Sequence, residues 1–445
     1  MADSKPELYG VPMIPFGLLS GFVNEKEVRI TEFSEEGFRF RTAKPCLAPV
    51  TVRLAFWQMN KSSYKEVSLA VPAFSYEQNF DYFYEYTVFT KNPDYRSAVH
   101  DLLSWYGSYV NLKLNEDDSG LAMALTGYPA EQEDVHFENF AAQKEAWFQK
   151  PDFSFLNIDT PELAMELDRP ELYASYLNRN LEDWISHYWA SNHLSWHPLS
   201  LLRPNRLYIG NQFCHLLFPE ETTLFQLMEK AYEEELKLTL SFSYLREFML
   251  EPVNQLLGKI NDWCLAHQTA IEIIINDWAM ANLLHDDPQL LPVLGTLINK
   301  RRKDPRLSYK KGNPSFLSEN SINADFYRKF VTDKIGIKRY EWESCGYLPH
   351  FPEGKHSLHL PFYQTNTSQY CPLYARCQKG DRGAQTLPDH CPHWCSQYAF
   401  LYPAHLHMTG RYNSLFALDT EILRSPELLA RWLNAGVDRL VINLL

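Results

Sequence analysis

Near its middle the chain reads Ala270-Ile-Glu-Ile-Ile-Ile-Asn-Asp277, a short run of β-branched residues that ends in two polar side chains. This composition predicts a strand. Amphipathic patterns on either side, from Glu247 to Ala266 and from Trp278 to His285, predict helices. A strand between two helices is typical of βα units, in which neighbouring strands run parallel.

The same alternation extends from about Leu207 to the end of the chain, so that eight strands are expected in all. The other seven are Leu207–Asn211, Leu236–Ser241, Pro292–Thr296, Gly336–Glu343, Ser357–Pro361, Ser414–Leu418 and Arg439–Asn443. The handedness of βα connections leaves an open doubly wound sheet or a barrel, and eight strands favour the barrel. We therefore predict an α/β fold in which residues 205–445 form a TIM-barrel-like domain, complete or incomplete.

The first 117 residues have a different pattern and are expected to form a small β-barrel or sandwich that ends in a helix. Strands are predicted at Glu27–Phe33, Val50–Trp57, Glu66–Val71 and Tyr82–Phe89, and the helix from about Tyr95 to Leu112. Residues 118–204 are expected to form an acidic linker and then a helical connector. The order of residues in Thr160-Pro-Glu-Leu predicts a helix start there, with an N-cap and a proline at the first helical position.

The composition is that of an ordinary globular protein, with 45% hydrophobic and 22% charged residues. No run approaches the roughly 18 to 20 apolar residues that cross a bilayer, and the N-terminus lacks a signal-like segment. We therefore expect a cytoplasmic protein with no membrane span. A net charge of -13 argues against a general nucleic-acid coat, because neutralising phosphates requires a basic face.

One local segment is nevertheless basic. Seven lysines and arginines lie within residues 297–311, and the candidate ligand-binding residues among them are Lys300, Arg301, Arg302 and Arg306. They predict an anion-binding loop for a small molecule or an RNA backbone. The alternative is a solvated loop that keeps this surface soluble.

Four of the eight cysteines lie within 25 residues, with the spacing C-x5-C-x13-C-x3-C: Cys371, Cys377, Cys391 and Cys395. Stable disulfides are uncommon in a reducing cytosol, so this cluster predicts a metal site. Thiolates favour zinc or an iron–sulfur cluster, and two disulfides or four buried thiols are the alternatives. His390 and His393 are close enough in sequence to influence the ligands.

The four remaining cysteines are scattered. Cys46, Cys214 and Cys264 are expected to be small core residues, whereas Cys345 is a candidate spare ligand.

Barrel enzymes place their chemistry at the carboxyl ends of the strands. The polar residues expected there are Asn211, Ser241, Asn276, Asp277, Asn299, Glu341, Glu343 and His359. Those that can transfer protons, and so are the candidate catalytic residues, are Asp277, Glu341, Glu343 and His359. Asp277 also precedes a predicted helix, and capping of that helix is the favoured interpretation of the Asn276-Asp277 pair.

The stretch Ile273–Asp277, the run Leu294–Arg306, the strand Lys338–Glu341 and the cysteine cluster together resemble the collagenase-like (U32) peptidase family. The resemblance covers about residues 205–445. It implies a barrel fold and a 4Fe-4S cluster held by the four clustered cysteines. Some family members are linked to oxygen-independent hydroxylation of RNA bases or quinone precursors, and others are regarded as peptidases. The wide gaps between the cysteines favour an iron–sulfur cluster over zinc.

The turn Glu32-Phe-Ser-Glu-Glu-Gly37 resembles part of the motif of PilZ domains, which bind cyclic diguanylate. Met1 to Lys26 contains no arginine, although the family has an arginine pair before this motif. A domain used for contacts is therefore favoured over a nucleotide sensor.

Three functions follow from these observations. The first is an iron–sulfur enzyme that carries out redox or hydroxylation-type modification of an anionic substrate. The second is a regulatory or adaptor protein with a structural metal and a protein partner, and the third is a peptidase.

Overall fold

The computed structural model describes residues 7–12, 18–58, 63–80, 82–114, 142, 144–149, 162–284, 287–303, 317–379, 386–388, 390–402 and 407–445. They divide into two compact units. The first holds the described residues up to 114 together with Leu317, and the second holds the remaining residues from 142 on.

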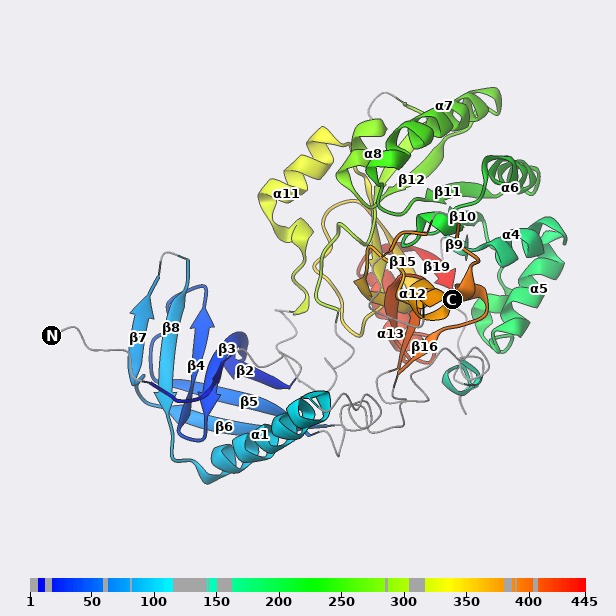
Figure 1. Cartoon of the computed structure of the whole chain (residues 1–445). Coiled ribbons are helices and arrows are strands. Elements are labelled where there is room, and N and C mark those ends of the chain that lie inside the picture. The colour runs from blue at the N-terminus through cyan, green and yellow to red at the C-terminus, as the bar shows by residue number, and fades with distance from the viewer. Residues whose placement is uncertain are drawn as a thin grey trace. The chain divides into compact units, whose positions relative to one another are not determined.

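The N-terminal unit is an antiparallel sheet with the strand order β6-β5-β2-β3-β4-β8-β7, and β1 pairs with β3 (Figure 1). Its elements are β1 Val11–Pro12, β2 Leu19–Val23, β3 Lys26–Ser34, β4 Gly37–Thr42, β5 Val50–Gln58, β6 Ser63–Val71, β7 Tyr76–Asn79, β8 Tyr84–Phe89 and helix α1 Pro93–Leu114. Alternate residues along the strands, such as Val52, Leu54 and Phe56, are buried in one core with Tyr95 of α1. The predicted strands and the predicted helix are all present.

The second unit is a closed barrel of eight parallel strands (Figure 1). Its strands are β9 Leu163–Leu167, β10 Arg206–Gly210, β11 Lys237–Ser241, β12 Ile271–Ile275, β13 Leu290–Leu294, β14 Arg339–Glu343, β15 Lys355–Thr367 and β19 Val437–Asn443. They pair in the order β9 to β15, and β19 closes the ring between β15 and β9. The predicted TIM-barrel-like α/β fold is confirmed.

Helices follow most of the barrel strands and cover their outer faces (Figure 1). The helices of this unit are α4 Pro170–Leu177, α5 Leu181–Ser191, α6 Glu221–Glu233, α7 Leu250–Ala266, α8 Trp278–Leu283, α11 Asp325–Lys329, α12 Pro372–Lys379 and α13 Pro426–Asn434. In α6 the buried residues Leu224, Leu227, Met228 and Ala231 recur at helical spacing, and they join the large core outside the barrel.

Short single-turn helices connect these elements. They are η3 Pro198–Leu201, η4 His215–Leu217, η5 Glu247–Met249, η6 Ser321–Asn323, the π-helical η7 Phe330–Lys334 and η8 Trp394–Ser396. η4 and η8 carry part of the candidate site described below.

Two sequence predictions need correction. The helix expected from Thr160 is instead β9, because the helix-forming residues of Leu163–Leu167 are buried between β10 and β19, and this burial overrides their local preference. The strand β18 Ser414–Leu418 is present but lies outside the barrel. It pairs antiparallel with the end of β15 and with β17 Met408–Arg411, which in turn pairs with β16 Phe400–Leu401.

Candidate functional site

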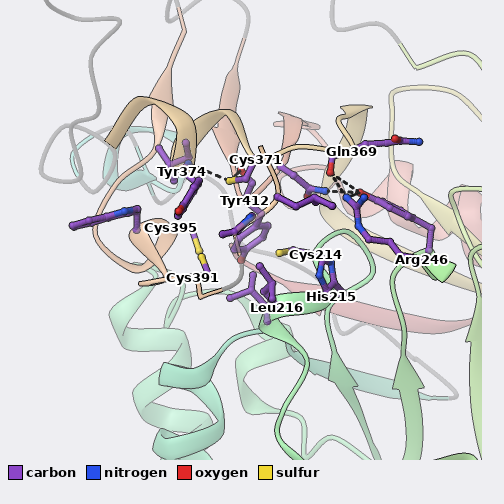
Figure 2. A pocket seen from close by; sticks show the side chains of 17 residues that line it. Cys214, His215, Leu216, Arg246, Gln369, Cys371, Tyr374, Cys391, Cys395 and Tyr412 are labelled. Atoms are coloured by element: carbon purple, nitrogen blue, oxygen red, sulfur yellow. Dashed lines mark hydrogen bonds between the residues drawn. The ribbon is translucent and has the colours of Figure 1, made fainter. Parts of the chain in front are cut away.

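Four cysteine side chains line one pocket of the barrel unit, as Figure 2 shows. Cys214 comes from the loop after β10, and Cys371 directly precedes α12. Cys391 and Cys395 come from the loop that ends in η8. Segments that are far apart in the sequence therefore supply thiols to the same pocket.

The loop that carries Cys214 is shaped by Asn211, which follows β10. The Asn211 side-chain oxygen accepts hydrogen bonds from the backbone N–H groups of Phe213, at 2.9 Å, and Cys214, at 2.8 Å. Its amide nitrogen donates to the Asp168 carbonyl at 3.1 Å, beyond the end of β9. This Asx-type turn brings Cys214 back over the carboxyl end of the barrel.

Backbone N–H groups donate to two of the other thiols. The N–H of Tyr374 donates to Cys371 Sγ at 3.3 Å, and the N–H of His393 donates to Cys391 Sγ at 3.4 Å. His393 has a left-handed conformation, with φ 56°, and its ring Nε2 lies 3.1 Å from the Leu216 carbonyl. This contact ties the Cys391 loop to the Cys214 loop.

The pocket is poor in negative charge. No carboxylate is among its described lining residues, whereas the cation Arg246 is. Arg411 donates two hydrogen bonds to the Cys395 carbonyl, at 3.0 and 2.9 Å. Burial raises the pKa of Cys214 to about 12 and of Cys371 to about 11, and it also raises the pKa of Cys391 and Cys395. Without a bound metal, these four thiols are therefore protonated at neutral pH.

The thiols surround the pocket without forming a compact ligand set. None of the eight cysteines forms a disulfide bond, and no group of three or more Cys, His, Asp or Glu among the described residues is close enough to hold a metal ion. The donor chemistry nevertheless suits an iron–sulfur or zinc site, because four sulfurs face one space that contains N–H donors and an arginine but, among its described lining residues, no carboxylate.

Three of the four predicted ligands line this pocket. They are Cys371, Cys391 and Cys395, whereas Cys377 lies on α12, near Cys371, and does not line it. Cys214 is the fourth cysteine that lines the pocket, although its isolation in the sequence suggested a core residue. The sequence contained one indication that Cys214 could belong to the site, because this residue follows shortly after a predicted barrel strand.

Cys345, the candidate spare ligand, lies elsewhere. It is buried in a small core with Tyr363 and Met408, and it does not line the pocket.

A second group of functional side chains lies in the barrel lumen around His359 on β15. His359 Nε2 is 2.6 Å from a carboxylate oxygen of Glu341, and Nδ1 is 3.5 Å from one of Glu166. The Tyr208 hydroxyl donates to Glu341 at 3.1 Å. Burial alone would lower the pKa of His359, but hydrogen bonds and charge from Glu166 and Glu341 outweigh it and raise the pKa to about 10.

Sequence reasoning identified His359 and Glu341 but missed Glu166 and Asp168. Both belong to the β9 region, which was assigned to a helix. The Asn443 side chain donates to Glu166 at 2.9 Å and to Asp168 at 3.3 Å, and the Tyr412 hydroxyl donates to Asp168 at 2.8 Å. Because Tyr412 lines the cysteine pocket, these contacts join the lumen to that pocket.

The other two candidate catalytic residues have structural partners. Asp277 caps α8 by accepting from the Met280 N–H at 2.8 Å, and it also accepts from the Leu245 N–H. The capping interpretation is confirmed. Glu343 accepts from the Gln364 N–H at 2.6 Å and forms an ion pair with Lys303.

The basic segment is only partly available for an anion. Arg301 donates to the backbone carbonyls of Glu343, at 3.2 Å, and Tyr347, at 2.7 Å, so its guanidinium group is part of the fold. Lys300 and Arg302 are exposed, and Arg306 lies outside the described residues. The anion-binding loop stays a prediction.

The PilZ-like turn joins β3 and β4. Glu32 pairs with Arg39, and the Ser34 hydroxyl accepts from the Glu36 N–H at 3.2 Å. The Tyr95 hydroxyl lies 2.8 Å from the Ser34 carbonyl and 2.7 Å from the Gly37 carbonyl. The turn is thus bonded within the N-terminal unit, and its use for contacts, favoured over cyclic diguanylate binding, stays a prediction.

In the part of the chain that the structure describes, no helix is both long and apolar enough to span a membrane. No protein-family model matches the chain, and no curated protein matches it by sequence. Among solved structures, the U32 peptidase Mk0906 aligns with 66% of this chain and 96% of its own, at 7% identity and a TM-score of 0.30. A similarity this low leaves the family of this chain unassigned.

Proposed function

We propose that the cysteine pocket holds an iron–sulfur cluster and that the protein is a redox protein that modifies a substrate, with hydroxylation-type chemistry as the leading candidate. The observation that carries this proposal is the convergence of Cys214, Cys371, Cys391 and Cys395 on one pocket with no carboxylate among its described lining residues. A cluster bound there would supply electron transfer, or Lewis acidity if one iron were left open.

The chain's own residues suit this role in two ways. The N–H groups of Tyr374 and His393 already point at sulfur, and such hydrogen bonds stabilise thiolate charge. The positive charge of Arg246 and Arg411 offsets the negative charge that four thiolates would bring into a partly buried space.

The peptidase alternative has less support from these side chains. A cysteine nucleophile needs a lowered pKa, and burial raises the pKa of all four thiols in the pocket. The expected anionic substrate is supported only by the exposure of Lys300 and Arg302 to solvent.

The test is anaerobic purification followed by visible spectroscopy and by quantification of iron, sulfide and zinc. We expect a brown protein with about four irons per chain. In single-substitution variants, Cys214→Ser, Cys371→Ser, Cys391→Ser and Cys395→Ser should lose the cluster. Cys377→Ser and the control Cys46→Ser, in the N-terminal unit, should retain it.

Two results would contradict the proposal. A colourless protein with one zinc would make the site structural and favour the adaptor function. Loss of the cluster in Cys377→Ser but not in Cys214→Ser would show that α12 rearranges to supply the fourth ligand.

A further inference from the structure

Helix α1 packs against strands β5 and β6 of the N-terminal unit (Figure 1). A hollow of about 310 Å³ lies between them. Small-molecule sites in proteins range from roughly 300 to 1,000 Å³. The hollow is therefore large enough for a ligand of the size of one amino acid.

The hollow forms where the apolar core of this unit ends. Phe56 of β5 faces the core, and the next residue of β5 with the same orientation is Gln58. Along β6 the core residue Val67 is followed in the same way by Lys65, which lies opposite Phe56 in the antiparallel pair. On the face that packs against α1, both strands thus change from apolar to polar side chains.

The helix supplies the opposite wall. Ala98 and Leu102 are buried in the core, and Trp105 follows them on the same face of α1, three residues after Leu102. Asp101 lies one turn before Trp105. All four residues line the hollow. It therefore combines an apolar floor with an aromatic residue and a carboxylate.

Two opposite charges line the hollow, Lys65 from β6 and Asp101 from α1. Lys65 is half-buried and Asp101 is exposed. Neither side chain forms an ion pair or a hydrogen bond with another described residue, and the two do not pair with each other. The remaining ionisable lining residue, His100, lies 3.2 Å from a carboxylate oxygen of Glu35. One cation and one anion can therefore both bond to a ligand.

This balance of charge distinguishes between classes of ligand. Lys65 disfavours a polyamine or another cation, and Asp101 disfavours a phosphate or a simple carboxylic acid, because like charges repel. A zwitterion satisfies both residues. Its carboxylate can accept from the Lys65 ammonium group, and its own ammonium group can donate to the Asp101 carboxylate.

We infer that this hollow binds a free α-amino acid with an apolar side chain. Lys65 holds the carboxylate of the ligand, and Asp101 holds its ammonium group. The side chain of the ligand packs against Trp105, Phe56 and Leu102. This site belongs to the N-terminal unit and does not depend on the cysteine pocket or on its proposed cluster.

The test uses saturation-transfer NMR on the purified full-length chain with L-leucine, L-methionine, L-phenylalanine and L-tryptophan. Each amino acid is compared with two analogues that lack one charge: its amide, without the carboxylate, and its N-acetyl derivative, without the ammonium group. We expect saturable binding of at least one amino acid. Both of its analogues should bind about three- to tenfold more weakly, because each loses one charge-assisted bond at a partly exposed site.

Two variants connect each charge of the ligand to one residue. In Lys65→Met the amino acid and its amide should bind equally, and in Asp101→Asn the amino acid and its N-acetyl derivative should bind equally. Each variant should also weaken binding of the amino acid about three- to tenfold. The exposed-site controls Lys91→Met and Asp94→Asn should not.

A second measurement addresses folding. Because neither side chain bonds to another described residue, both variants should keep the melting temperature of the unsubstituted protein. The comparison of each amino acid with its analogues needs no variant, so it also applies if a variant fails to fold. The proposal is overturned if none of the four amino acids binds saturably, if either analogue binds as tightly as its parent, or if the controls weaken binding as much as Lys65→Met and Asp101→Asn.

Discussion

The two ends of the barrel lumen differ in how their charges are paired. At the amino end, Arg439 donates to Glu162 at 2.6 Å and to both oxygens of Glu272, at 2.6 and 2.9 Å. Arg339 holds Asp438 through two bonds, at 2.8 and 2.9 Å. At the carboxyl end, a single histidine, His359, lies between two carboxylates.

This difference matches the division of labour in TIM barrels, where the amino end provides stability and the carboxyl end carries chemistry. The amino-end ions are bonded to one another, and their arginines hold the pKa of Glu272 at about 2 against the opposing effect of burial.

The largest expected effect is on the amino end. Arg439→Met should lower the free energy of unfolding by at most about 3–5 kcal/mol, because it removes one of the arginines that bond the partly buried carboxylates of Glu162 and Glu272 and leaves Arg206 as their shared partner. Urea denaturation measures this loss. The control Lys259→Met removes a surface ion pair with Glu221 and should cost less than about 1 kcal/mol. Equal costs in the two variants would mean that the amino-end network does not stabilise the barrel.

A second effect, which depends on pH, is expected at the carboxyl end. Because the pKa of His359 is about 10 in the folded protein and about 6.5 when unfolded, its protonated form stabilises the fold fully below pH 6.5. This contribution declines as the pH rises and is lost above about pH 10, by at most about 1.4 kcal/mol per pH unit. Unfolding measured from about pH 6 to about pH 10 should therefore show a shallower decline in His359→Gln than in the unsubstituted protein. If the stability of the variant and of the unsubstituted protein declined equally with pH, the ion pairs around His359 would not contribute to stability.

The smallest effect concerns His356, three residues earlier on β15 and outside the lumen. Trp342 Nε1 donates to its Nδ1 at 3.1 Å, and its Nε2 lies 3.0 Å from the Pro352 carbonyl, so the ring is neutral. Burial lowers its pKa to about 4. Its contribution to stability is therefore complete above pH 6.5 and is lost as the pH falls toward 4.

Acid unfolding of His356→Gln measures this contribution. The variant should lose less stability between pH 6.5 and 4 than the unsubstituted protein, while its behaviour above pH 6.5 should be unchanged. A change on the alkaline side instead would mean that the two histidines do not titrate independently.

Local sequence patterns predicted most of the barrel, because buried strands and amphipathic helices have distinct periodicities. They failed at Leu163–Leu167, whose leucine, alanine, methionine and glutamate favour a helix, and at Ser414–Leu418, whose pattern does not distinguish a parallel barrel strand from an antiparallel extension. The first failure also concealed Glu166 and Asp168.

The sequence also predicted only some of the residues of the candidate site. Clustering in the sequence identified Cys371, Cys391 and Cys395, and strand-end position identified His359 and Glu341. Cys214 could not be found by clustering, because it lies far from the others along the chain and joins them only when β10 and the η8 loop meet.

The sequence by itself determined the alternation of strands and helices and the presence of a thiol-rich segment, because both depend on neighbouring residues. Only the tertiary structure decided which strand closed the ring, which cysteine joined the pocket and which carboxylates faced His359. Closing a barrel brings together residues that are far apart in the sequence. Local periodicity predicts that a side chain is buried, but it does not predict which side chains it contacts.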